Sequence, residues 1–176
     1  MRSLPARFAG LMALALLFPL RASAQCTTEW TDPGGGDWRE ADNWSAGVPG
    51  EDADACIRLA GTYTVEVDRA AVARSLAVGG ASGTQTLVLG TSLTLSEGAD
   101  VAANGVLQWN NGTLTAGADV TVAGTLVFAT GSEKKLGENT TLVSTGGAAW
   151  TGGSLRLLQA ATFENRAMMA VTDGSS

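Results

Sequence analysis

The sequence predicts an all-β fold, a right-handed, three-sided parallel β-helix with about 20 residues per coil and an N-terminal cap rich in tryptophan. Three observations support this prediction. One apolar phrase recurs along the chain with an almost constant step, short apolar strands alternate with breaks rich in glycine, and no stretch after residue 24 keeps the 3.6-residue apolar period of a helix. A single repeat of this kind cannot bury its apolar side alone, so the stacking of coils has to supply the core.

Residues 1–24 have the features of a cleavable signal peptide. Two arginines precede an apolar run at 11–20, and the small residues at 22–24 fit the cleavage rule. The apolar run is about half of the roughly 20 residues that span a bilayer, which disfavours a membrane anchor. Lipid modification of Cys26 is disfavoured because the residue before it is a glutamine rather than a small residue. We therefore expect a secreted protein, extracellular or on the cell surface.

The mature chain is predicted to be strongly acidic. The leader contains three of the 11 basic residues and none of the 17 acidic ones, so 8 basic and 17 acidic groups remain, a net charge of −9. Such a chain repels nucleic acid phosphates and anionic lipid surfaces. We expect no nucleic acid partner and no insertion of the mature chain into a membrane.

Residues 25–60 are predicted to form a cap that shields the first coil of the β-helix. This segment contains Trp30, Trp38 and Trp44 and several turn-forming runs of proline and glycine. The favoured interpretation is that the three rings are buried and stabilise the cap. The alternative is a weak sugar-binding site, in which the rings stack on pyranose faces.

Cys26 and Cys56 bracket the cap and are predicted to form a disulfide in an oxidising compartment. Closing a loop of this length stabilises a fold by roughly 3 kcal/mol on the loop-entropy model. Two free buried thiols are the alternative.

The cap also carries four aspartates that are weak calcium candidates, Asp37, Asp42, Asp52 and Asp54. Calcium prefers several oxygen ligands, but the spacing of these residues matches no calcium-binding loop. A charged, soluble cap surface is the favoured interpretation. We expect no metal ion and no cofactor.

Residues 61–176 are predicted to be the β-helix repeats, and three columns of apolar residues align them. The first column has steps of 20, 19, 22 and 19 residues and extends back to Val67; its members are Leu89, Trp109, Phe128, Trp150 and Met169. The second is Leu76, Leu95, Leu114, Leu136 and Leu155, and the third is Val101, Val120, Leu142 and Phe163. Glycines follow the first three members of the third column, at Gly105, Gly124 and Gly146. Steps of 19 to 22 residues favour the right-handed form, because the left-handed form usually keeps a strict period of about 18 residues.

The repeats stop near Val171 without a recognisable C-terminal cap. An open last coil would expose unpaired strand edges. We therefore expect further domains to follow or a partner strand to pair with this edge.

The residue types present exclude several kinds of catalysis. The chain has no histidine, which excludes Ser-His-Asp and Cys-His catalysis and the usual zinc sites. Polysaccharide lyases and hydrolases stay open, but they need two facing carboxylates or clustered acids. The predicted outward rows contain no such cluster; they are Thr94, Thr115 and Arg156 on one face, and Ala102, Thr121, Val143 and Glu164 on another. We predict no catalytic residues.

The cap sequence resembles a known pattern. Gly36-Asp37-Trp38, followed by Asn43-Trp44-Ser45 and Gly47-Val48-Pro49, is similar to the start of bacterial secreted or surface β-helix proteins of the autotransporter-adhesin type. The phrases at 109–114 (WNNGTL) and 150–155 (WTGGSL) match the repeats of the same group, and a weaker similarity links the cap to the G8 domain of extracellular proteins. The resemblance implies export and a structural or adhesive role toward a cell-surface glycan or protein. A carbohydrate-binding or polysaccharide-degrading β-helix is the alternative.

Overall fold

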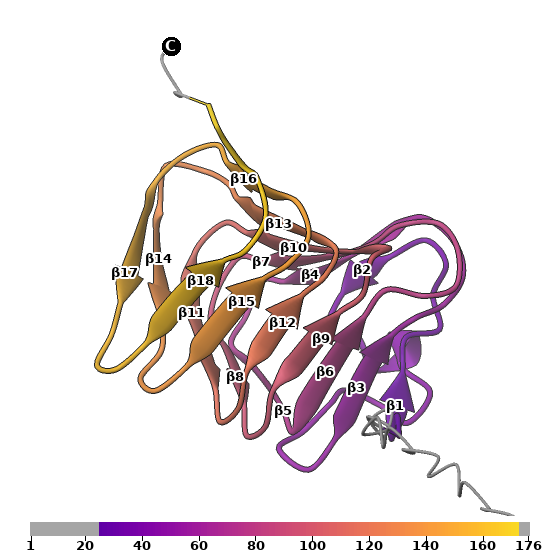
Figure 1. The fold of residues 1–176 in the computed structure, drawn as a ribbon. Coiled ribbons are helices and arrows are strands. Elements are labelled where there is room, and N and C mark those ends of the chain that lie inside the picture. Colours follow the sequence, from indigo (N-terminus) through magenta and orange to yellow (C-terminus); the bar gives the residue numbers. More distant parts are fainter. Residues whose placement is uncertain (1–24, 173–176) are drawn as a thin grey trace, which may run out of the picture.

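The computed structural model describes residues 25–172, so the predicted signal peptide at 1–24 lies outside the described residues. The described chain forms a right-handed parallel β-helix with three sides, and its coils are stacked one on the next (Figure 1). After the cap, residues that pair between successive coils are 19 to 23 positions apart. The predicted fold class is confirmed.

Each side of the solenoid is one parallel sheet. Sheet I contains β1 (Thr28–Glu29), β3 (Asp54–Ile57), β6 (Ser75–Val78), β9 (Ala99–Val101), β12 (Val120–Val122), β15 (Thr141–Ser144) and β18 (Thr162–Asn165). Sheet II contains β2 (Gly36–Asp37), β4 (Tyr63–Val67), β7 (Gln85–Leu89), β10 (Gly105–Trp109), β13 (Thr125–Phe128), β16 (Ala148–Trp150) and β19 (Met169–Val171). Sheet III contains β5 (Ala71–Ala73), β8 (Leu93–Leu95), β11 (Gly112–Ala116), β14 (Glu133–Leu136) and β17 (Ser154–Leu157).

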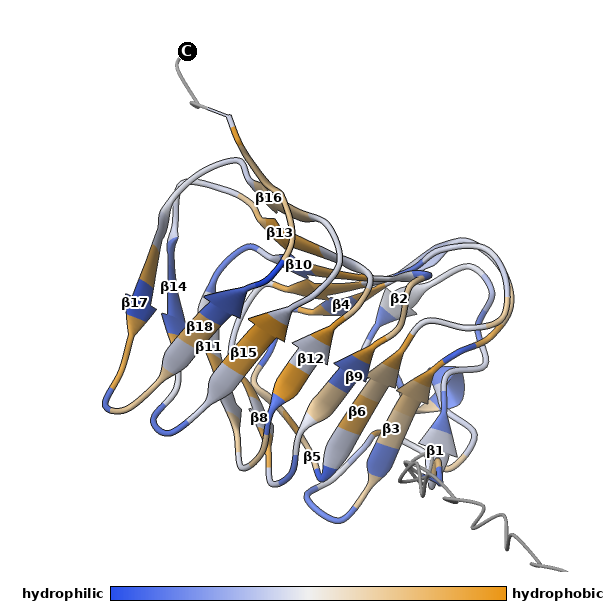
Figure 2. Cartoon of the chain, viewed as in Figure 1, coloured by the Kyte–Doolittle hydropathy of each residue, from blue (hydrophilic) through white to orange (hydrophobic). Residues whose placement is uncertain are grey.

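The strands form because their apolar residues alternate with polar or small ones. In β4, Tyr63, Val65 and Val67 are buried, whereas the residues between them face outwards. Successive side chains of a strand point to opposite faces, so this pattern gives each strand one apolar side. Figure 2 shows the resulting change of hydropathy along the strands. All three sheets turn their apolar sides inwards, where they form one shared core.

The first predicted column is confirmed from its start to its fifth member. Val67, Leu89, Trp109, Phe128 and Trp150 are directly paired on successive strands of sheet II. Their rings stack as well: the ring centroids are 6.0 Å apart for Trp109 and Phe128 and 4.7 Å apart for Phe128 and Trp150. Trp109 and Phe128 are therefore core, and Trp150 is partly buried and packs against it.

The last member of that column was predicted wrongly. Trp150 pairs with Val171. Met169 lies two residues before Val171 and pairs with Ala148. A shift by two residues keeps the same side chains on the inner face, so the apolar pattern does not distinguish the two registers.

The second and third columns contain errors of the same kind. Leu114 pairs with Leu136 as predicted, but Leu93 and Leu157 replace Leu95 and Leu155 as their neighbours. Leu76 lies in sheet I, where it pairs with Ala99. Ala99 also replaces Val101 in the third column, whose other members, Val120, Leu142 and Phe163, are paired as predicted.

The three predicted glycines mark the turn from sheet I to sheet II. A side chain on Gly124 would collide with the backbone oxygen of Gly105, and one on Gly146 would collide with that of Gly124. Consecutive coils thus approach so closely at this corner that no Cβ atom fits between them.

The cap closes the N-terminal end of the stack. It consists of β1, β2 and a short 3-10 helix, η1 (Ala41–Asn43), and the backbone N–H of Trp38 donates to the carbonyl of Glu66 in the first full coil. The disulfide between Cys26 and Cys56 is confirmed, with Cα atoms 5.7 Å apart. β3, which lies within the predicted cap segment, already pairs with β6 of the following coil.

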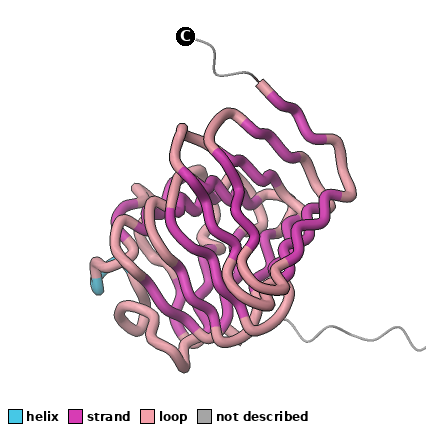
Figure 3. The backbone as a smooth tube through the Cα atoms, turned by 90° about the vertical axis from the view of Figure 1, so that its left-hand side faces the viewer, coloured by secondary structure: helices cyan, strands magenta, loops and turns pink. Residues whose placement is uncertain are grey.

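The opposite end of the described chain is open. In the last coil Leu157 is 47% exposed and Val171 is 67% exposed, although equivalent residues of earlier coils are buried. Figure 3 shows the final turns at the end of the stack farthest from the 3-10 helix. The described residues 25–172 include no helix that could span a membrane.

Substituting Gly124 by alanine tests the close contact at the corner. The new methyl group forces two coils apart, so we expect a loss of about 2–3 kcal/mol in the free energy of unfolding. Gly131 is the matched control, because no other atom lies within 4 Å of the position of its Cβ. Gly131→Ala should change stability by less than about 0.5 kcal/mol. Denaturant unfolding of both variants is the measurement, and equal effects would contradict the stacked corner.

Candidate functional site

The three cap tryptophans are buried in the core. The exposed fractions of Trp30, Trp38 and Trp44 are 2%, 0% and 4%. Trp44 packs edge-on against both of the others, with ring centroids 5.1 Å from Trp30 and 4.9 Å from Trp38. Its indole N–H donates to the carbonyl of Trp38 at 2.8 Å. No ring face is left for a pyranose, so these residues give no support to a sugar-stacking site.

The four calcium candidates are not brought together. Asp54 binds Arg74 and Ser75, and Asp37 accepts a hydrogen bond from the backbone N–H of Arg39 at 2.7 Å. Asp42 lies on the 3-10 helix, and Asp52 is exposed in a turn. Between residues 25 and 172, no three acidic, cysteine or histidine side chains are grouped so that they could hold a metal.

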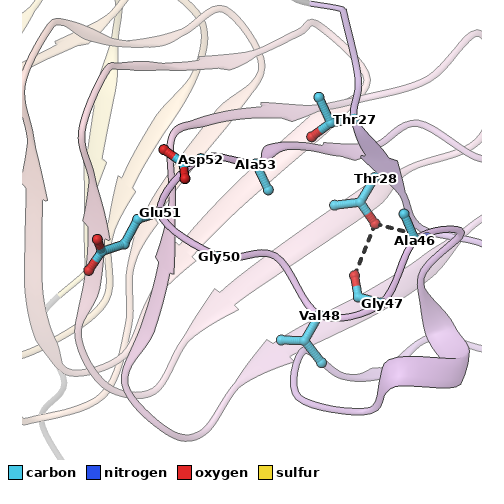
Figure 4. A pocket seen from close by; sticks show the side chains of 9 residues that line it. All are labelled: Thr27, Thr28, Ala46, Gly47, Val48, Gly50, Glu51, Asp52 and Ala53. Carbon is cyan, nitrogen blue, oxygen red and sulfur yellow. Dashed lines mark hydrogen bonds between the residues drawn. The ribbon is translucent and has the colours of Figure 1, made fainter.

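A shallow depression lies within the cap, between β1 and the loop at residues 46–53 (Figure 4). Its volume is about 380 Å³, and its lining includes Thr28, Val48 and Asp52. The hydroxyl of Thr28 donates to the carbonyl of Gly47 at 3.0 Å and accepts from the N–H of Ala46 at 3.3 Å. This hydroxyl already holds the cap loop in place, so the depression is a seam between β1 and the loop of the same cap.

Asp54 is the centre of a buried polar cluster. Arg74 donates two hydrogen bonds to its carboxylate, and the hydroxyl of Ser75 donates a third at 2.6 Å. The hydrogen bonds from Arg74 hold the pKa of Asp54 below its usual value, with Ser75 and the charge of Arg74 acting in the same direction and burial opposing them. The cluster joins the first two coils at the corner between sheets III and I.

Lys134 is a buried cation inside the solenoid. Its side chain is fully buried, and its ammonium donates to the carbonyls of Thr130, Ser132 and Gly152 at 2.9, 3.0 and 2.9 Å. Burial lowers the pKa of this lysine. The three carbonyls satisfy the three N–H donors of the ammonium. Thr130 and Ser132 lie in the turn before β14 and Gly152 lies in the turn before β17, so Lys134 joins equivalent turns of two successive coils. Its role is structural, and sequence reasoning missed it because a lysine beside Lys135 looks like a surface residue.

The predicted outward rows are partly wrong. Thr94 and Thr115 are neighbours on sheet III as predicted, but Arg156 pairs with Lys135 in the adjacent row. On sheet I, Thr121, Val143 and Glu164 form one row as predicted, and Asp100 stands in it where Ala102 was expected. The rows are again displaced by two residues.

The outer face of sheet II is a third face that sequence reasoning did not separate from the others. It carries two rows of side chains, which we call the sheet II face. One row is Thr64, Thr86, Val106 and Thr125, and the other is Glu66, Val88, Gln108, Val127, Ala149 and Ala170. Most of these residues are small or β-branched and uncharged.

Charge is segregated away from the sheet II face. Among the described residues, the strands β7, β10, β13 and β16 and the turns on both sides of them contain no Asp, Glu, Lys or Arg. The charged residues of these coils lie on sheets I and III and in the turns between those two sheets: Glu97, Asp100, Asp119, Glu133, Lys134, Lys135 and Glu138. The face is charged only near the cap, at Glu66 on β4 and Asp37 on β2.

Comparison of the chain with protein-family models, with curated proteins and with solved structures finds no match. The candidate site therefore rests on the geometry of the described residues. The sheet II face is the feature that this geometry distinguishes.

Lowering the pH tests the Asp54 cluster. Since the folded pKa of Asp54 is below its ordinary value of 3.8, the folded chain binds this proton less readily than the unfolded chain. The stabilisation is complete above pH 3.8 and is lost as the pH falls through the folded pKa. Because 42% of the Arg74 side chain is exposed, we expect Asp54→Asn to cost only about 1 kcal/mol at pH 7.

The measurement for Asp54 is thermal unfolding between pH 2 and 7, with exposed Asp42→Asn as the control. The gap in stability between wild type and Asp54→Asn should narrow at the acidic end. A gap that is constant over this range would contradict the assignment.

Replacing Lys134 by methionine tests the buried ammonium. The variant keeps a similar apolar stem but leaves three carbonyls without their donor, so we expect a loss of about 2–4 kcal/mol. Lys135→Met is the matched control, since Lys135 is half exposed and lies 3.6 Å from Glu133 on the outer face. It should cost at most about 1 kcal/mol. Denaturant unfolding separates the two, and equal losses would argue against the carbonyl cage.

Proposed function

We propose that this chain is a secreted or cell-surface structural and adhesive β-helix module without catalytic activity. Its contact surface is the sheet II face, which meets a cell-surface protein or glycan. The observation that carries the proposal is the absence of charge from β7, β10, β13 and β16 and their turns, within a described chain that is otherwise rich in acids.

The physical argument concerns desolvation. A charged side chain has to give up hydration when a partner covers it, whereas threonine, valine and alanine lose little. The sheet II face can thus be covered at low cost, and the rigid stack behind it fixes the side chains before contact. A preorganised face loses less conformational entropy on binding than a flexible one.

Three features support an extracellular location. The disulfide between Cys26 and Cys56 is typical of proteins that fold in an oxidising compartment. The composition of residues 1–24 has the pattern of a signal peptide. The cap phrase from Gly36 to Pro49 resembles secreted β-helix proteins of bacteria.

A sedimentation assay with bacterial envelope fragments tests the proposal. We expect the purified protein to bind the fragments and the double variant Val88→Glu, Val127→Glu to bind at least tenfold more weakly, because two charges are then placed on the sheet II face. The control Thr94→Glu, Thr113→Glu adds the same charge to sheet III and should bind like the wild type. Circular dichroism verifies that all three proteins are folded.

Two results would overturn the proposed function. One is a wild-type protein that does not sediment with envelope fragments at any concentration tested. The other is equal binding by the variants of sheets II and III, because the contact would then lie elsewhere on the chain.

A further inference from the structure

The sheet II face has the properties of a surface that packs on a copy of itself. It is formed by successive parallel strands that lie side by side along the stack (Figures 1 and 3). Its two rows consist largely of threonine, valine and alanine, with Gln108 between Val88 and Val127 in the second row. Side chains of this size interdigitate when two sheets pack face to face about 10 Å apart.

The net negative charge of the chain disfavours contact between copies through the charged sheets and leaves the sheet II face as the favourable one. The full sequence carries 17 acidic and 11 basic residues, a net charge of −6, so two copies repel each other at long range. On sheet I, residues such as Asp100 and Glu164 would face their own counterparts. Like charges opposed across an interface disfavour binding strongly. The uncharged strands of sheet II avoid this cost.

An exposed methionine extends the apolar part of the face. Met168 is 90% exposed and directly precedes β19. The backbone N–H of Ala148 donates to the carbonyl of Met168, and that of Leu126 donates to the carbonyl of Gly147. Met168 therefore lies in line with Gly147 and Thr125 of the two preceding coils. Methionine adapts to irregular surfaces, so it suits the edge of a contact. Together with Ala149 and Ala170 it gives the C-terminal half of the face an apolar character.

The size of the face indicates how strong such a contact is. The five strands β7, β10, β13, β16 and β19 contain no charged residue, and Arg166 lies in the turn before β19. With a spacing of about 4.8 Å and their flanking turns, these strands cover roughly 500 Å². Two copies then bury about 1,000 Å² in total, just below the range of about 1,200–2,000 Å² for stable interfaces. An area of this size corresponds to a reversible dimer.

We infer that the partner of the sheet II face is a second copy of this chain, and that two copies form a reversible, face-to-face dimer. This inference rests on the proposed function and names its partner. The dimer is isologous, so each copy contributes the same side chains. A single substitution on the face therefore introduces two charges into the interface.

Sedimentation equilibrium over about 1–200 µM protein measures the average molecular mass. A dimer with an interface of this size should dissociate at the low end of that range. We expect the average mass to rise from one chain to two. Val127→Glu should stay a monomer up to at least tenfold higher concentration, and Thr94→Glu on sheet III should associate like the wild type. Equal melting temperatures of the three proteins rule out unfolding as the cause.

Cross-linking identifies the face that is covered. The two native cysteines form a disulfide, so a cysteine introduced at Gln108 is the one free thiol of the variant. Gln108 lies on β10, in the middle of the uncharged strands. With a short bis-maleimide, Gln108→Cys should give a covalent dimer, whereas Thr94→Cys should not.

Three outcomes would overturn the inference. The first is a wild-type protein that stays monomeric up to the highest concentration of about 200 µM, because an interface of the proposed size would then not form. A dimer that persists in Val127→Glu uses another surface, such as the open last coil around Leu157 and Val171. Equal cross-linking at positions 94 and 108 reports random collisions. A wild-type protein that is monomeric but binds envelope fragments, and loses this binding in the Val88→Glu, Val127→Glu variant, would use the sheet II face for a different partner. In that case the proposed function stands and the dimer is overturned.

Discussion

No described coil can satisfy its own backbone, because its strands pair with strands of the neighbouring coils, on both sides within each sheet and on one side at the sheet ends. Parallel pairing in register therefore decides where each residue goes. It places Leu89, Trp109 and Phe128 in one inner row and brings the backbones so close at the corner that only glycine fits at position 124. The N-terminal end of the stack is closed by the tryptophan cap. The last described coil has a neighbour on one side alone, so its inner residues are partly exposed.

The polar groups that look most reactive in this chain are used to hold it together. The carboxylate of Asp54 is bound by Arg74 and Ser75, and the ammonium of Lys134 is bound by three carbonyls. Buried Gln85 likewise accepts from the N–H of Gly80 and donates to the carbonyl of Ser82 at 3.0 Å. All three side chains fasten turns, which are the parts of a coil where backbone groups have no strand partner. What remains for recognition is the outer surface.

On that outer surface the three sheets differ in charge more than in shape. Sheet I carries Asp100 and Glu164, and sheet III carries Lys135 and Arg156, whereas the central strands of sheet II present threonine, valine and alanine. The backbone that supports all three is the same, so the difference comes from the side chains alone. An uncharged face on an acidic, rigid solenoid favours a contact role, and self-association is its simplest form because identical faces match in size and charge.

The sequence by itself determined the period, the inward aromatic residues and the Cys26–Cys56 bridge, because apolar spacing and cysteine chemistry are local properties of the chain. It also located the corner glycines at 105, 124 and 146. Only the tertiary structure decided the register. A shift of two residues leaves the same side of a strand facing the core, so Met169 and Val171, or Leu93 and Leu95, fit the pattern equally well. The composition of each outer face depends on that register and on the length of each turn, which is why the uncharged face of sheet II emerged only from the folded chain.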